Sequence, residues 1–224
     1  MTYFKALTGF AAGAVALIAS ASAATITQGF TFTVADDGAG GGLHYHSSTN
    51  GDFGNAAGLA GVGNWSSEEE RGMSEYDLTG LSSAASAFVT FDMLRADAAL
   101  SYGYAQYLGN IRIEAYVGNN TEDETDFSIA SVATVATFSA ASLVAGDTLS
   151  FDITALFNSL VGTESSLGLR LVAENLVGNT AITFNNFRLT TDNLSTNPVP
   201  VPAAALLFAP AIIGGAVARR RRKA

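Results

Sequence analysis

Apolar and polar residues alternate with a period of two along much of the chain. Between Asn110 and Val117, for example, Ile111 and Ile113 fall on one face, while Arg112 and Glu114 fall on the other. Such alternation is typical of a half-buried strand. On this pattern, with related apolar runs, we expect eight or nine strands, placed at residues 25–34, 74–78, 85–94, 110–117, 127–138, 149–153, 167–171 and 181–190.

Segments rich in Gly, Asn, Asp, Ser and Thr separate these strands, at residues 36–42, 49–64, 118–126 and 175–179. One short helix is predicted over Thr154–Leu160, with Asp152 or Thr154 as its N-terminal cap and Gly162 at its end. No alternation of strands with long helices occurs. The pattern therefore predicts an all-β domain, an antiparallel β-sandwich of jelly-roll type with one short helix.

The N-terminus has the pattern of a Sec signal peptide. Lys5 precedes an apolar stretch, residues 10–18, and the small residues Ala21 and Ala23 follow it. This order predicts a signal helix cleaved after Ala23, with the Sec translocon and signal peptidase as partners. An N-terminal membrane anchor is the alternative, but the apolar stretch is too short to cross a hydrocarbon layer of about 30 Å.

The C-terminus combines a second apolar segment with a basic cluster. Residues 199–218 are uncharged, and as a helix they would extend about 30 Å, enough to span a bilayer. A cluster of five cations follows, at Arg219, Arg220, Arg221, Arg222 and Lys223. Such a cluster holds its end of a transmembrane helix in the cytoplasm. A buried helix of a globular fold is the alternative, but it gives no reason for five adjacent cations.

The residues before this helix carry a resemblance to a known class of sorting signals. The motif comprises Val199, Pro200, Val201, Pro202 and Ala203. Together with the apolar helix and the Arg cluster, it resembles the PEP-CTERM signals of bacteria, in the VPLPA-CTERM variant, with Val201 where that variant has Leu. The resemblance implies cleavage by an exosortase-type protease, after an inner-membrane intermediate, and delivery to the cell surface or an exopolysaccharide matrix. We therefore divide the chain into a signal peptide (1–23), a β-sandwich domain (24–195) and a sorting signal (196–224).

Without its two ends the chain is strongly acidic. The body has five arginines, no lysine and all 20 acidic residues, a net charge of −15. Such a field repels nucleic acid, which excludes a nucleic-acid partner, and it favours binding of cations. No cysteine is present, so disulfides and thiolate metal sites are excluded as well.

Three segments contain candidate metal ligands. His44 and His46 have the spacing that places both side chains on one face of a strand. The acidic run Glu68–Glu70 and the loop Asn119–Asp126 concentrate the oxygen ligands that Ca²⁺ prefers. Solvated surface is the commoner role of such runs. The alternative that we retain is one structural Ca²⁺ somewhere in the body, with its ligands unassigned.

Aromatic residues provide candidate sugar contacts. Trp65, Tyr102, Tyr104 and Tyr107 would offer flat faces for sugar rings, although core packing is the commoner role of such residues. Segments between Arg71 and Leu189 also resemble jelly-roll modules found beside carbohydrate-active enzymes, including the DNRLRE type. They are Glu75–Leu78, Phe151–Thr154 and Leu167–Leu171. This likeness concerns the fold alone.

The sequence thus favours an exported, non-catalytic protein of the cell surface or exopolysaccharide matrix. No nucleophile elbow, P-loop or HExxH motif is present, and two histidines two residues apart leave few options for acid–base catalysis. The first alternative is a carbohydrate-binding module, and the second is a polysaccharide-processing enzyme.

Overall fold

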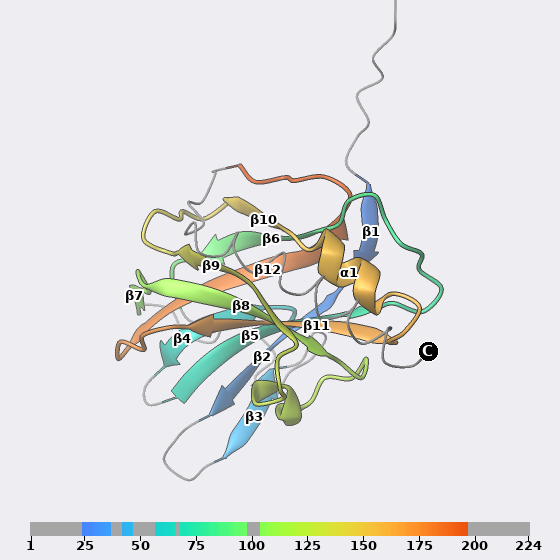
Figure 1. The fold of residues 1–224 in the computed structure, drawn as a ribbon. Coiled ribbons are helices and arrows are strands. Elements are labelled where there is room, and N and C mark those ends of the chain that lie inside the picture. Colours follow the sequence, from blue (N-terminus) through green and yellow to red (C-terminus); the bar gives the residue numbers. More distant parts are fainter. Residues whose placement is uncertain (1–23, 37–41, 47–56, 66–67, 98–103, 197–224) are drawn as a thin grey trace, which may run out of the picture.

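The computed structural model describes residues 24–36, 42–46, 57–65, 68–97 and 104–196 (Figure 1). Both predicted terminal segments, the signal peptide and the Val-Pro motif with its helix and Arg cluster, lie outside these residues. The elements are β1 (Thr25–Gln28), β2 (Phe30–Asp36), β3 (Leu43–His46), β4 (Ala60–Trp65), β5 (Glu68–Asp77), β6 (Phe88–Arg95), β7 (Ala105–Gln106), β8 (Asn110–Val117), the 3₁₀ helix η2 (Glu124–Phe127), β9 (Ala133–Ser139), β10 (Thr148–Asp152), α1 (Thr154–Leu160), β11 (Ser166–Ala173) and β12 (Thr180–Thr190).

All these strands belong to a single sheet that curls almost into a barrel. Its main path runs β10-β6-β12-β4-β5-β11-β8-β9. The two end strands of this path, β9 and β10, approach each other, as the curvature in Figure 1 shows. Every pairing is antiparallel except the short one between β7 and β12.

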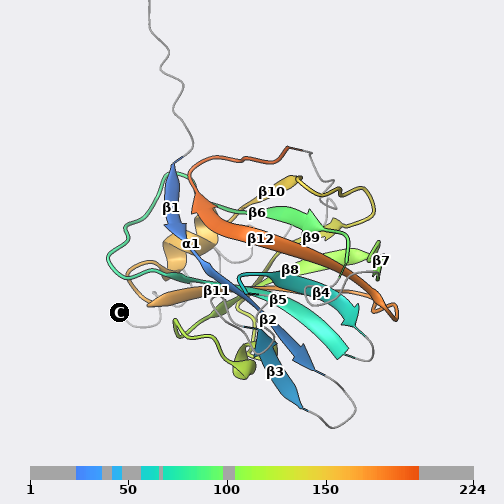
Figure 2. The same cartoon turned by 180° about the vertical axis from the view of Figure 1, so that it is seen from behind.

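The first two strands cross the back of this sheet as one diagonal, which is clearest in Figure 2. β1 pairs with the end of β12, and after Gly29 the chain continues as β2, which pairs along β5. β3 then pairs with β2. β1, β2 and β3 therefore form a side branch of the sheet, which joins the main path at β12 and at β5.

The interior of the curled sheet is filled by an aromatic stack. Phe91 packs against Phe187 at 4.6 Å between ring centroids and against Phe184 at 5.3 Å. Phe138 on β9 and Phe151 on β10 lie 5.3 Å apart, so their side chains join the two end strands. Each such buried ring contributes on the order of 2 kcal/mol relative to exposure, which favours the nearly closed shape.

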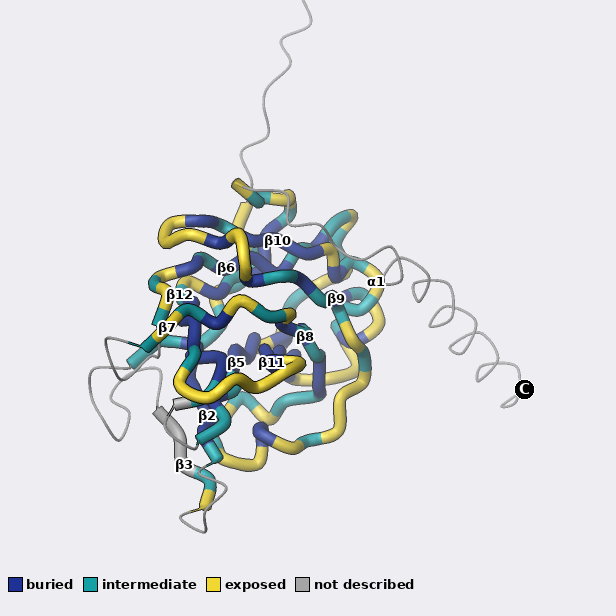
Figure 3. Tube along the Cα trace, turned by 90° about the vertical axis from the view of Figure 1, so that its left-hand side faces the viewer, coloured by how far each residue is buried: buried dark blue, intermediate teal, exposed yellow. Residues whose placement is uncertain are grey.

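The helix α1 belongs to the same interior core. Phe157 is fully buried and Leu160 is 9% exposed, and both pack with the core residues of the strands. A second cluster lies on the outer face of the sheet, where Phe32, Val34, Met73 and Phe127 are buried together. Figure 3 shows the buried strands enclosed by exposed connections.

The last described residues run along the free edge of β10. The N–H of Thr148 donates to the Thr196 hydroxyl at 2.9 Å, and the N–H of Thr196 donates to the Thr148 carbonyl at 3.0 Å. The N–H of Ser150 donates to the Ser195 hydroxyl at 3.0 Å. Part of the β10 edge is therefore paired by the chain's own C-terminal segment.

The predicted all-β class with one short helix is confirmed, because α1 is the one α-helix of the described residues and spans Thr154–Leu160 as expected. A jelly-roll sandwich is not confirmed, since the strands form one curled sheet. Several details differ from prediction: β4 lies in a segment expected to be a turn, β5 begins at Glu68 instead of Ser74, and residues 127–132, expected to be strand, contain the end of η2. Among the described residues, no helix has the length and apolar character needed to cross a membrane.

Candidate functional site

The connection between β8 and β9, residues 118–132, covers the outer face of the sheet; we call it the strap. Beneath it the strand register places Glu75 of β5, Gly168 of β11 and Tyr116 of β8 side by side. The next row contains Met73, Arg170 and Glu114. Because the strap covers this face, every residue of β11 is buried. The polar side chains of both rows are therefore held away from solvent.

Arg170 joins the sheet to the strap. Its Nε and Nη2 donate to Glu114 Oε2 at 3.1 and 2.5 Å, and its Nη1 donates to the carbonyls of Asp126 and Phe127, each at 2.8 Å. A further bond of 3.2 Å reaches the carbonyl of Ile129. Charge-assisted bonds of this kind are stronger than neutral ones, so Arg170 fixes the course of the strap.

The charge of Arg170 is balanced by Glu114. Although burial acts to raise it, the pKa of Glu114 is lowered by hydrogen bonds from Arg170 and Arg112. Glu114 therefore stays ionised, and the two residues form an ion pair beneath the strap.

Arg71 makes a second connection to the strap. Its Nη1 donates to the Phe127 carbonyl at 2.5 Å, and its guanidinium carbon lies 3.9 Å from the centroid of the Phe127 ring. Its Nε pairs with Glu69 at 2.6 Å. The strap is thus attached at Phe127 through its backbone and its side chain.

Glu75 is a fully buried carboxyl in this site. Its Oε2 accepts hydrogen bonds from the Ser166 hydroxyl at 2.9 Å and the Asn120 N–H at 2.8 Å, whereas its Oε1 has no hydrogen-bond partner. Burial raises the pKa of Glu75, and this effect exceeds the lowering by the bonds from Ser166 and Asn120. The Tyr116 hydroxyl also interacts with this carboxyl and lowers its pKa, but without the geometry of a hydrogen bond.

Asp126 is a second buried carboxyl, supplied by the strap, and it is 1% exposed. Burial and the negative charges of Glu75 and Asp123 raise the pKa of Asp126 to about 7. Its Oδ2 has no hydrogen-bond partner. Two acidic groups, one from the sheet and one from the strap, therefore lie near each other in a buried environment.

Two glycines allow this close packing. A Cβ at Gly168 would lie 2.2 Å from atoms of the Tyr116 ring, and a Cβ at Gly118 would lie 2.4 Å from the Glu75 carboxyl. Both distances are far below normal van der Waals contact. Glycine at these positions lets the Tyr116 ring lie on β11 and lets the backbone of the strap approach Glu75.

The predicted sugar contacts lie in different environments. Tyr107 is 1% exposed, and its hydroxyl donates to the Asn110 carbonyl at 2.9 Å, so it is a core residue whose ring faces are covered. Tyr104 is half-buried next to β7, and the backbone of Trp65 ends β4. Tyr102 lies outside the described residues. Because Thr180 pairs with Asn64 on one side and Ala105 on the other, Trp65 and Tyr104 lie at the same end of the sheet.

Two of the three predicted metal-ligand segments lie on either side of β2, where His44 and Glu70 both pair with Ala35, and the third lies in the strap. His44 and His46 lie on β3, paired with β2, while Glu68–Glu70 begins β5, where Glu70 is fully buried. In the loop Asn119–Asp126, Asp123 accepts bonds from Asn119 and Thr125 and caps η2. Within the described ranges, no three His, Asp or Glu side chains form a group that would hold a metal ion.

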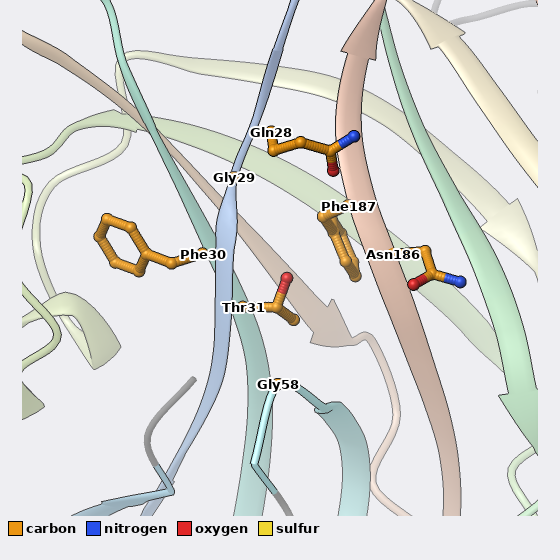
Figure 4. Close-up of a pocket in the computed structure, with 7 residues that line it drawn as sticks. All are labelled: Gln28, Gly29, Phe30, Thr31, Gly58, Asn186 and Phe187. Atoms are coloured by element: carbon orange, nitrogen blue, oxygen red, sulfur yellow. The ribbon is translucent and has the colours of Figure 1, made fainter. Parts of the chain in front are cut away.

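A shallow hollow lies where the β1–β2 diagonal meets β12, with a volume of about 270 Å³. Gln28, Thr31 and Asn186 provide polar groups there. In Figure 4 the side chains of Phe30 and Asn186 point to opposite sides, so the lining groups do not converge on one point. This volume is smaller than that of a typical ligand pocket.

The chain matches no protein-family model, and a search of curated proteins gives no match either. The site beneath the strap is therefore known from its geometry alone. Sequence reasoning placed Arg170 and Glu114 on the face opposite the core and included Asp126 in the loop of candidate Ca²⁺ ligands, but it did not identify Glu75 as a site residue. The signal for Glu75 was weak, because an acidic side chain on the outer face of a strand is usually solvated.

Proposed function

We propose that the chain is an exported, non-catalytic protein of the cell surface or exopolysaccharide matrix, sorted through its C-terminal segment by an exosortase-type protease. The observation that carries this proposal is the order Val-Pro-Val-Pro-Ala, apolar helix and Arg cluster at residues 199–223. A signal peptide of residues 1–23 supports it, because the two segments together place the body across the inner membrane from its own C-terminus.

The body has properties suited to such a location. It has no cysteine, so its folding does not depend on the redox state of the compartment. Its net charge of −15 favours solubility in a hydrated matrix. Both properties agree with a passive structural role, in adhesion or in organisation of the matrix.

The test is mass spectrometry of both ends of the protein after fractionation of its native host. We expect a mature N-terminus at Ala24 and loss of the segment that follows the Val-Pro motif. Replacing Pro200 and Pro202 by Ala should leave the tail uncut and the protein in the membrane fraction. Pro198→Ala, outside the motif, is the matched control and should be processed normally. Intact chains in the cytosol, with neither end trimmed, would refute the proposal.

Carbohydrate binding is a second candidate function. It is favoured by the placement of Trp65 and Tyr104 at the same end of the sheet, on strands on either side of β12. Binding to a polysaccharide array should be lost on Trp65→Ala or Tyr104→Ala and kept on Tyr107→Phe, since Tyr107 is buried. Polysaccharide turnover by the purified protein would instead favour a processing enzyme.

A further inference from the structure

The carboxyls of Glu75 and Asp126 each have an oxygen with no hydrogen-bond partner, although both residues are at least 99% buried. The side-chain oxygen of Asn120 and the hydroxyl of Tyr116 are also buried without such a partner. A buried polar atom that makes no hydrogen bond loses the hydrogen bonds that it makes with water in the unfolded chain, and the cost is larger for a charged atom. Oxygens without a partner in two neighbouring buried carboxyls indicate a ligand that accepts lone pairs.

The charged residues of the site indicate that this ligand is positively charged. Arg170 is neutralised by Glu114, with which it forms the ion pair. When ionised, Glu75 and Asp126 carry two negative charges, and the body has no lysine to approach them. The raised pKa of each carboxyl has burial as its largest cause, as expected for acids in a poorly solvated place. A divalent cation would balance the two charges.

A proton shared between the two carboxyls is the simplest competing arrangement. A protonated carboxyl donates a hydrogen bond, so it places its oxygen within bonding distance of an acceptor. The two arrangements differ in one measurable respect, because only a cation site gains stability as Ca²⁺ is added.

We propose that Glu75 and Asp126 bind one hard divalent cation of the Ca²⁺ class, with Asn120 and Tyr116 as neutral oxygen donors. Hard cations prefer oxygen ligands, and waters complete the coordination of Ca²⁺ where protein ligands are few. Because Glu75 belongs to the sheet and Asp126 to the strap, the cation ties the strap to β5. This inference does not depend on the proposed export or sorting.

The test is thermal unfolding of the full-length chain in detergent, with added Ca²⁺ or with a chelator. Binding to the folded state alone raises its melting temperature progressively with cation concentration. We expect this rise in the unaltered protein and its loss in Glu75→Gln and Asp126→Asn. Glu124→Gln, at an exposed position of the same strap, is the control and should keep the full rise.

A second comparison distinguishes a ligand from a merely structural residue. In chelator, Glu75→Gln should melt at or above the temperature of the unaltered protein, because it removes a buried charge that has no counter-ion. In Ca²⁺ it should melt below the unaltered protein. A variant that is weaker by the same amount in both conditions would contradict the proposal.

Direct binding is measured with Tb³⁺, which takes Ca²⁺ sites and emits when a nearby aromatic ring absorbs light. We expect tyrosine-excited Tb³⁺ emission that Ca²⁺ displaces and that Tyr116→Phe strongly reduces. This variant keeps the ring on Gly168 and so tests the site even if the acidic variants do not fold. Absence of a Ca²⁺-dependent melting shift, or Tb³⁺ emission unchanged by Tyr116→Phe, would overturn the proposal.

Discussion

Arg170 is the residue whose replacement should weaken the outer layer most. Arg170→Met keeps much of the side-chain volume but removes the ion pair with Glu114 and the bonds to the strap carbonyls. Breaking a buried ion pair by removing one partner costs about 3–5 kcal/mol. Glu114 keeps its bond of 2.8 Å from Arg112, so we expect the lower end, about 3 kcal/mol.

The assay is urea unfolding followed by circular dichroism, together with a thermal melt. For a chain of this size, about 3 kcal/mol corresponds to a fall in melting temperature of about 6–12 °C. Arg188→Met is the matched control, because its contact with Asp92 is 3.4 Å and lies nearer the surface, so it should cost about 1 kcal/mol or less. The double variant Arg170→Met with Glu114→Gln should lose less than the sum of the two single losses.

A loss below about 1 kcal/mol for Arg170→Met, or the same loss as for Arg188→Met, would refute this reasoning. It would mean that Arg170 contributes little to holding the strap on the sheet. Additive losses in the double variant would likewise show that Arg170 and Glu114 are not coupled.

Three further outcomes follow from the packing of the interior and of β11. Gly168→Ala places a Cβ 2.2 Å from the Tyr116 ring and should destabilise the protein by about 1–3 kcal/mol in urea unfolding. The control Gly178→Ala, whose Cβ would have no atom within 4 Å, should leave the stability almost unchanged. Phe91→Ala removes the centre of the aromatic stack and should cost about 3–5 kcal/mol in the same assay, and a loss under about 1 kcal/mol would contradict the packing described. Burial raises the pKa of Tyr76 above its ordinary value, so the contribution of the neutral phenol to the free energy of unfolding is complete below about pH 10 and is lost as the pH rises further. An ultraviolet titration of phenolate should show Tyr76 ionising only on unfolding. Tyr76→Phe should remove one late-ionising group from that titration.

Local signals in the sequence predicted much of the sheet. β8 spans Asn110–Val117 as its alternation indicates, because one face meets the interior core. α1 spans Thr154–Leu160 as predicted, but its N-cap is Ile153, without a side-chain capping bond, and not Asp152 or Thr154. Asp152 lies one residue before the cap and accepts a bond from the Thr154 N–H. Where the burial of one face sets the periodicity of an element, the sequence alone predicts the type and the bounds of that element.

The parts that prediction missed depend on contacts between distant segments. β4 contains Gly61 and Gly63, which are typical of turns, and it is a strand because β12 and β5 pair with it on either side. Arg170 lies on the outer face, where alternation predicts solvent, but the strap covers it and leaves it 5% exposed. No local pattern predicts where a connection of this length folds back.

The same limitation applies to the candidate site. Glu75 and Asp126 are about fifty positions apart and belong to different elements, so only the folded chain brings them together. The predicted sugar contacts were chosen by residue type, and Tyr107 shows the weakness of that choice, because a tyrosine ring suits a core as well as a binding face.

The pairing of Ser195 and Thr196 with β10 has a consequence for any enzyme that cuts the tail. Three residue steps separate Thr196 from Val199, a reach of at most about 11 Å for an extended chain. A protease that recognises the Val-Pro motif would therefore have to bind close to β10, at the edge of the curled sheet. If the tail is cut there, whatever replaces it would be joined to the body by a very short tether, which would restrict the orientation of the body and turn its β10 edge toward the attachment point.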